Sequence, residues 1–226
     1  MEANNTARLK LKDIITLSIF NIAILVVMVI VKIVITMAAT PVFNYLFYVG
    51  VMAFFCAPLY IVMSNKTAKR GVFFITALFC GLMMAAFGSA WFLAVMITVG
   101  IICELVMAGA DTYKNPVRNG IGYVVYWTLY ALGSSIPLFF FKERYLKSLG
   151  DSYTEEGKAI LIRFYGSVDM LLLIALISAE LGATAELRGL DAPQKRSCMY
   201  AVRFSVYDIL TSGIYGAAMF LFYYKI

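Results

Sequence analysis

The sequence predicts an all-α, polytopic membrane protein built as a six-helix bundle, and three observations support this fold class. Of the 226 residues, 62% are hydrophobic and the mean hydropathy is +0.85, whereas soluble domains contain roughly 45–50% apolar residues. Only 14% of the residues are charged, and they fall between apolar blocks. The first block, residues 14–31, carries no charge and is long enough to span a membrane as a helix.

A basic cluster directly before this first helix predicts its orientation. The cluster contains Arg8, Lys10 and Lys12, and further basic loops occur at residues 65–70 and 188–196. Short cytoplasmic loops of membrane proteins carry an excess of Lys and Arg, so we expect the N-terminus to be cytoplasmic. The predicted parts of the chain are the basic N-terminus over residues 1–13, the membrane domain over residues 14–188 and a C-terminal part over residues 189–226.

The next three apolar blocks predict three further helices. A second helix is expected over residues 45–63 with a kink at Pro58, because proline is tolerated inside membrane helices. Two more are expected over residues 72–88 and 92–110, joined by a tight turn that ends at Trp91. So short a connection makes these two helices antiparallel neighbours and puts Trp91 at the outer membrane interface.

A fifth helix is expected over residues 120–141 and a sixth over residues 164–185. The fifth contains Pro137 near its outer end, after two serines and a glycine, where the backbone can bend. Residues 142–163 form the longest polar stretch of the chain and are expected to lie outside the cell. Small residues four apart in the sixth helix, Ser178 and Gly182 among them, predict close packing against another helix.

The apolar C-terminal tail leaves two alternatives open. Residues 199–224 contain Arg203 and Asp208 near their start, which leaves a short uncharged stretch over residues 209–224. This segment is either a short seventh membrane span or a segment that lies on the membrane surface.

The composition argues against several chemistries. The chain has no histidine, which removes the usual zinc ligand, general base and haem ligand. Its four cysteines occur singly and are expected to be small packing residues. No G-x-x-x-x-G-K-[ST] motif is present to cradle nucleotide phosphates. The net charge of +6 follows from membrane topology, so no nucleic-acid partner is expected.

Several short motifs, taken in order, match a known family. They are LKLKDIIT at residues 9–16, APLYIVM at residues 57–63, KRGVF at residues 69–73, Gly88 and Trp91 at the outer turn, and Glu104 late in the fourth helix. Over residues 8–185 the chain resembles the substrate-binding S components of energy-coupling factor (ECF) transporters, within them the Trep_Strep or MptD-like group.

The resemblance implies a bacterial plasma-membrane protein that captures a small micronutrient at its outer face and is not an enzyme. The implied partners are a transmembrane coupling protein and two ABC ATPases; these hydrolyse the ATP, and the chain needs no cofactor of its own. S components dock the coupling protein through small residues four apart on the first helix, but here Ser18 is followed by Ile22. Ser18, Asn21 and Ala23 are therefore the expected docking surface. The ligand stays open among vitamins, tetrapyrroles and cofactor precursors.

A pocket for such a ligand needs an apolar wall and a few convergent polar groups. We expect the connection over residues 39–44 to close over the ligand. The predicted substrate-binding residues, all in the outer half, are Asn44, Trp91, Ser134, Ser135, Tyr165 and Asp169.

Four charged residues inside apolar blocks each have two interpretations. Asp169 either contacts the ligand or pairs with a nearby cation. Lys32 either extends its stem to the outer interface or meets an anionic ligand. Glu104 and Glu180, near the cytoplasmic ends of their helices, are expected to pair with loop arginines or to meet the transport partners.

Two other function classes remain open. One is a self-sufficient small membrane transporter or channel subunit. The other is a membrane enzyme that uses Asp169, Glu104 or Glu180 as an acid or base, although no nucleophile–base arrangement is visible in the sequence.

Overall fold

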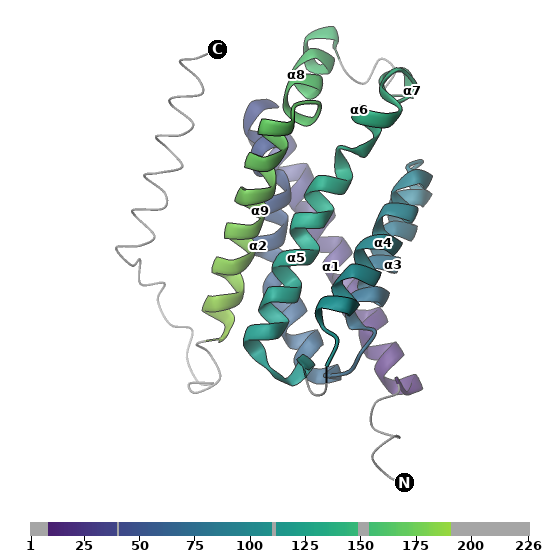
Figure 1. The fold of residues 1–226 in the computed structure, drawn as a ribbon, viewed down its shortest axis with the longest axis vertical. Coiled ribbons are helices and arrows are strands. Elements are labelled where there is room, and N and C mark those ends of the chain that lie inside the picture. The colour runs from purple at the N-terminus through teal and green to yellow at the C-terminus, as the bar shows by residue number, and fades with distance from the viewer. Residues whose placement is uncertain (1–8, 40, 110–111, 149–153, 191–226) are drawn as a thin grey trace, which may run out of the picture. The chain divides into compact units, whose positions relative to one another are not determined.

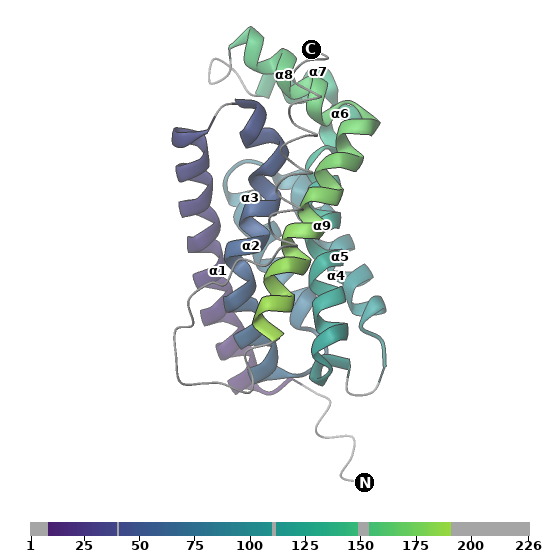
Figure 2. The same ribbon diagram turned by 90° about the vertical axis from the view of Figure 1, so that its left-hand side faces the viewer.

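The computed structural model describes residues 9–39, 41–109, 112–148 and 154–190. Within these ranges every regular element is helical, which confirms the all-α membrane bundle (Figure 1, Figure 2). The expected C-terminal span or surface segment lies outside the described residues. In the described part of the chain, four segments are long and apolar enough to cross a membrane, namely Leu11–Ala38, Phe43–Thr67, Pro116–Phe140 and Val168–Ala185.

Helices α1 (Leu11–Ala38) and α2 (Pro41–Thr67) pack against each other. Helix α2 continues through Pro58, as expected for a proline inside a membrane helix. The prediction of a loop over residues 39–44 is wrong, because α2 already begins at Pro41. Proline suits the first helical turn, where its missing N–H is not needed. The connection between α1 and α2 is therefore too short to close over a ligand.

Helices α3 (Val72–Ala86) and α4 (Ala90–Val106) form the predicted antiparallel hairpin. Gly88 makes the turn with a φ of 90°, a conformation that favours glycine. The two helices have 15 and 17 residues, which corresponds to about 22–26 Å at a rise of 1.5 Å per residue. They are thus shorter than the roughly 30 Å hydrocarbon core of a bilayer.

Helix α5 (Pro116–Ser134) begins earlier than expected because Asn115 caps its first turn. The short 3-10 helix η1 (Thr112–Lys114) precedes this cap. The backbone bend predicted near Pro137 is confirmed, since α5 ends and a separate short helix, α6 (Ile136–Phe140), follows it.

The polar stretch over residues 142–163 is largely helical in its described parts. It forms α7 (Lys142–Ser148) and most of α8 (Glu155–Tyr165). Helix α8 is amphipathic: Leu161 and Phe164 are buried, whereas the acidic residues of its first turn are exposed. Its apolar face packs against α2 and the helix that follows.

Helix α9 (Val168–Leu190) corresponds to the predicted sixth span. Its small-residue face packs as expected, because Ser178 is fully buried and Gly182 lies close to two neighbouring helices. A Cβ atom on Gly182 would lie 3.9 Å from Ala53 on α2 and 3.9 Å from Tyr123 on α5.

Aromatic side chains from α2, α3 and α5 fill the centre of the bundle. The Tyr60 ring lies 4.7 Å from the Tyr123 ring and 5.1 Å from the Phe73 ring, measured between centroids. The Tyr123 hydroxyl donates a hydrogen bond to the carbonyl oxygen of Ala53. These large side chains bury extensive apolar surface between the three helices.

Helix α1 lies at the edge of the bundle, where it packs mainly against α2 (Figure 2). Its outward face consists of exposed aliphatic residues such as Ile15, Ile19 and Val26. Such a face suits contact with lipid chains.

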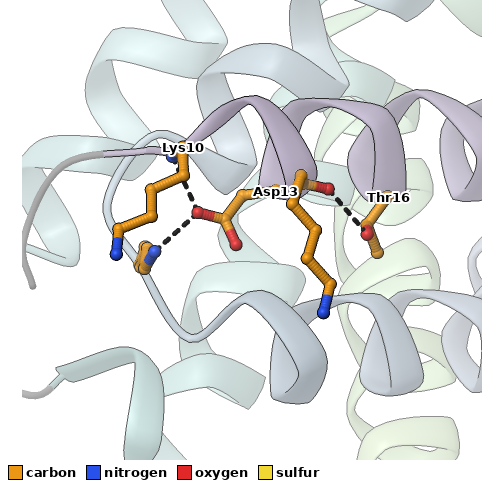
Figure 3. A network of polar contacts seen from close by, with 5 residues as sticks. Lys10, Asp13 and Thr16 are labelled. Atoms are coloured by element: carbon orange, nitrogen blue, oxygen red, sulfur yellow. Dashed lines mark hydrogen bonds and ion pairs between the residues drawn. The ribbon is translucent and has the colours of Figure 1, made fainter.

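Polar contacts fasten the beginning of α1 to the connection between α2 and α3 (Figure 3). Asp13 accepts a hydrogen bond from the backbone N–H of Lys10 at 2.8 Å and forms an ion pair with Lys69 Nζ at 2.5 Å. One turn later, Thr16 Oγ1 donates to the carbonyl oxygen of Lys12 at 2.9 Å. The basic cluster is thereby tied to the next basic loop at the same end of the bundle.

Candidate ligand-binding site

A cavity of about 210 Å³ lies at the end of the bundle formed by α6, α7 and α8. Each of the helices α1 to α8 contributes at least one side chain to its wall. The wall is mostly aromatic and aliphatic, with a few hydroxyls and one ammonium group, as in typical small-molecule pockets. We call it the Lys32 cavity; it is lined by Lys32, Tyr45, Tyr48, Met84, Ser89, Trp91, Phe92, Tyr130, Ser134, Leu138, Tyr145, Leu161 and Tyr165.

A second hollow of about 360 Å³ adjoins the Lys32 cavity. The two share Ser89, Trp91 and Tyr145 as wall residues, and Arg144 adds a positive charge to the second. We call it the Arg144 hollow. It lies between the α3–α4 turn and helices α6 and α7. Figure 1 shows that turn ending at a lower level than α7, because the α3–α4 hairpin is short.

Lys32 is half-buried in the cavity wall. Its Nζ donates to Asn44 Oδ1 across 3.4 Å and lies 3.9 Å from the centroid of the Tyr48 ring. The first distance is long for a hydrogen bond, and the second is typical of a cation–π contact. Among the described residues, no Asp or Glu forms an ion pair with Lys32.

Tyr165 joins helix α8 to the start of α2. Its hydroxyl donates to the carbonyl oxygen of Tyr45 at 3.0 Å, and the two rings meet edge to face with centroids 5.5 Å apart. This contact builds one side of the cavity wall from two aromatic rings.

The structure brings four of the predicted substrate-binding residues together. Trp91, Ser134 and Tyr165 line the Lys32 cavity, and Asn44 contacts the ammonium group of Lys32. The Ser134 hydroxyl donates to the carbonyl oxygen of Ala131, while the side chain still faces the cavity.

The other two predicted substrate-binding residues lie outside both cavity walls. Ser135 is 1% exposed and donates its hydroxyl hydrogen bond to the carbonyl oxygen of Leu132. Asp169 is exposed in the first turn of α9. Neither is among the residues that line the Lys32 cavity or the Arg144 hollow.

The predicted docking residues do not share one outward surface. Asn21 is 1% exposed, donates to a backbone carbonyl of its own helix and lines a small interior hollow. Ser18 and Ala23 are half-buried. The outward face of α1 at this level is formed by larger residues, Ile19 and Ile22.

Sequence reasoning gave Tyr48, Tyr130 and Tyr145 no role in the site, although all three line the cavity. The hydroxyl oxygens of Tyr48 and Tyr130 are 3.3 Å apart. Tyr145 belongs to α7 within the polar stretch, where the sequence has no hydrophobic pattern that would predict a pocket wall. The signal that could have found the site is Lys32, a charge that interrupts a long apolar helix.

Glu104 has different partners from the loop arginines expected for it. Its Oε1 accepts a hydrogen bond from the Tyr113 hydroxyl at 2.7 Å and one from the Phe74 backbone N–H at 3.3 Å. Burial raises the pKa of the Tyr113 phenol, and the neighbouring Glu104 carboxylate raises it further, so Tyr113 stays a donor. Glu104 thus caps the first turn of α3 from a neighbouring helix. Glu180 is exposed.

In the described ranges, no group of three or more His, Cys, Asp or Glu residues lies close enough together to hold a metal ion. Cys56, Cys80 and Cys103 are buried and unpaired, in keeping with a packing role, whereas Cys198 lies outside the described residues.

Comparison with known proteins identifies the family of the chain. Neither a search of curated proteins nor a search of solved structures returns a match. A family model described as "hypothetical bacterial integral membrane protein (Trep_Strep)" matches residues 11–193, a range that contains all the helices from α1 to α9. The chain therefore belongs to the Trep_Strep family of bacterial integral membrane proteins.

Proposed function

We propose that this multi-pass membrane protein is the substrate-binding subunit of an ECF-type ABC importer. In this role it captures a small micronutrient, such as a vitamin, a tetrapyrrole or a cofactor precursor, in the Lys32 cavity. The chain then delivers the ligand through a partner module of one coupling protein and two ATPases, and ATP hydrolysis occurs in those partners. The observation that carries the proposal is the cavity, which gathers aromatic walls and polar groups from helices α1 to α8.

The distribution of charge supports the expected direction of transport. Basic residues gather at the end of the bundle where α1 begins, and Lys69 there pairs with Asp13. The Lys32 cavity is lined by residues of α6, α7 and α8 among others, and these three helices lie at the other end of the bundle (Figure 1). If the basic end is cytoplasmic, the cavity faces the outside of the cell, as capture for import requires.

The sequence motifs support the same proposal independently. They run in order from the first helix to Glu104, as the resemblance to S components requires. The chain carries no P-loop motif, which is consistent with ATP hydrolysis by partner subunits.

The test has two parts. The full chain, expressed in its native host with an affinity tag, is expected to copurify with one coupling protein and two ATPases. Right-side-out vesicles that contain the complex are then expected to accumulate the copurifying small molecule only when ATP is enclosed inside them, on the cytoplasmic side. An ATPase variant without its P-loop lysine is the matched control.

Liposomes that contain this chain alone separate the proposal from its rival. An importer subunit is expected to give no flux without its partners. Flux through the chain alone would instead establish a self-sufficient transporter or channel, and a chain that neither binds the partners nor retains any small molecule would overturn the proposal.

A further inference from the structure

The Lys32 cavity holds a positive charge that its own wall does not neutralise. No Asp or Glu occurs among the lining residues, and in the described part of the chain no carboxylate forms an ion pair with Lys32. A half-buried ammonium group has lost part of its hydration, and a weak amide contact and an aromatic ring replace only some of it.

We propose that the Lys32 cavity selects an organic anion: a carboxylate or phosphate of the ligand pairs with Lys32, and the aromatic or apolar body of the ligand packs against the rings of the wall. This inference rests on the proposed function and names the class of substrate that the site takes.

The contacts that Lys32 makes within the protein hold its side chain in place but do not take the role of an anionic partner. Asn44 Oδ1 accepts a hydrogen bond from Lys32 Nζ across 3.4 Å, and the centroid of the Tyr48 ring lies 3.9 Å from the same nitrogen. Both contacts restrict the side chain but leave it able to donate to a ligand oxygen. Charge-assisted hydrogen bonds of this kind are shorter and about twice as strong as neutral ones.

By itself, the Lys32 cavity suits a body of one or two rings. A volume of about 210 Å³ is enough for such a group, and Tyr45, Trp91 and Tyr165 provide flat surfaces to contact it. A longer ligand can continue past Trp91 and Tyr145 into the Arg144 hollow, where a second cation is available.

A phospholipid headgroup has the same anionic chemistry as a soluble acid, and Lys32 lies on a membrane helix. The walls favour the soluble acid, because flat aromatic surfaces suit a ring better than an acyl chain. The experiment therefore includes a lipid arm.

The probes are 4-nitrobenzoate and 4-nitrobenzamide, which share one ring and differ in charge. Equilibrium dialysis against the purified full chain in detergent measures the Kd of each. The wild-type chain is expected to bind 4-nitrobenzoate roughly 10–100-fold more tightly than 4-nitrobenzamide, the range for a hydrogen bond to a charged group.

Quenching of Trp91 fluorescence in the Trp127→Phe chain, where Trp91 is the remaining tryptophan, gives a second measurement.

Three variants complete the design. Lys32→Gln is expected to abolish the preference for the carboxylate, whereas Lys32→Arg is expected to keep it. Lys147→Gln, which removes an exposed charge from α7 outside both cavity walls, is the matched control and is expected to bind as the wild type does.

Three results would overturn the inference. The wild-type chain could bind the two probes equally, or Lys32→Gln could keep the preference for the carboxylate. The third is that Lys147→Gln loses this preference as fully as Lys32→Gln does. Displacement of 4-nitrobenzoate by phosphatidylglycerol, but not by phosphatidylcholine, would assign the site to a lipid headgroup and overturn the choice of a soluble acid. These measurements need no partner subunit. Failure of the copurification test therefore leaves the anion preference standing, and loss of that preference leaves the importer role standing.

Discussion

Polar side chains in apolar surroundings serve two different purposes in this protein. Glu104 accepts two hydrogen bonds from neighbouring elements, so its oxygen atom is satisfied within the fold. Lys32 has weaker contacts and borders a cavity. The first arrangement stabilises the bundle, whereas in our proposal the second keeps a charge available for a ligand.

The Glu104 arrangement predicts a measurable coupling. Tyr113→Phe is expected to lower the free energy of unfolding by about 1.5–3 kcal/mol, because it removes a hydrogen bond to a carboxylate. Denaturant unfolding in mixed micelles measures this loss. In a Glu104→Ala background the same Tyr113→Phe change is expected to cost much less, and equal costs in the two backgrounds would show that the bond contributes nothing.

The placement of two predicted site residues leads to opposite expectations for their variants. Trp91→Ala removes a wall shared by both hollows and is expected to lower the amount of small molecule retained on purification by about tenfold, or ~1.4 kcal/mol. Asp169→Asn alters an exposed residue outside both walls and is expected to change retention by less than about twofold. Quantitative mass spectrometry of extracts from equal amounts of protein compares them, and the reverse order would mean that the site lies elsewhere.

At the level of elements, helix length decides where the hollows form. Helices α3 and α4 stop short of α6 and α7, and their turn leaves space that Trp91 and Tyr145 only partly fill. Close packing between α3 and α4 holds this short hairpin together. A Cβ atom on Gly100 would lie 3.1 Å from the Cα atom of Phe74 and 3.1 Å from the Cβ atom of Ala77.

This packing predicts that two Gly→Ala changes differ in effect. Gly100→Ala is expected to be about 1–2 kcal/mol less stable than Gly182→Ala, because overpacking against backbone opposes the gain in helix propensity. Gly182→Ala has room, with neighbours at 3.9 Å, and is expected to match or exceed the wild-type stability. Unfolding curves of the two variants test this, and a Gly100→Ala protein as stable as Gly182→Ala would contradict the close approach.

On the scale of the whole molecule, the two ends of the bundle are chemically different. One end holds the basic residues around the start of α1, and the other holds the Lys32 cavity beneath α8. This polarity is what an importer subunit would need, and it makes the membrane orientation testable.

We expect Lys147→Cys to react with a membrane-impermeant maleimide in intact cells and Asn65→Cys to react only after permeabilisation. Lys147 lies on α7 at the cavity end, Asn65 lies near the end of α2 at the basic end, and both are exposed. The three described cysteines are buried, and a Cys198→Ser background removes the fourth. Labelling with the opposite pattern would place the cavity in the cytoplasm.

Helix positions followed from the sequence because hydropathy and turn residues act locally. The apolar blocks predicted the six main helices, the short turn at Gly88 predicted the α3–α4 hairpin, and Pro137 marked the break after α5. The start of α2 was misplaced because Pro41 can either interrupt a chain or begin a helix, and the residue type alone does not decide between them.

The sequence by itself determined the membrane class, the helices and the presence of costly charges in them, because each depends on composition along a short stretch of chain. The tertiary structure alone decided which way each side chain faces. Lys32, Trp91 and Tyr165 converge on one cavity, whereas Asp169 faces outward and Asn21 inward. Helix packing sets the rotation of each helix about its axis, and a rotation of 100°, the step between successive residues, moves a side chain from a pocket to the lipid.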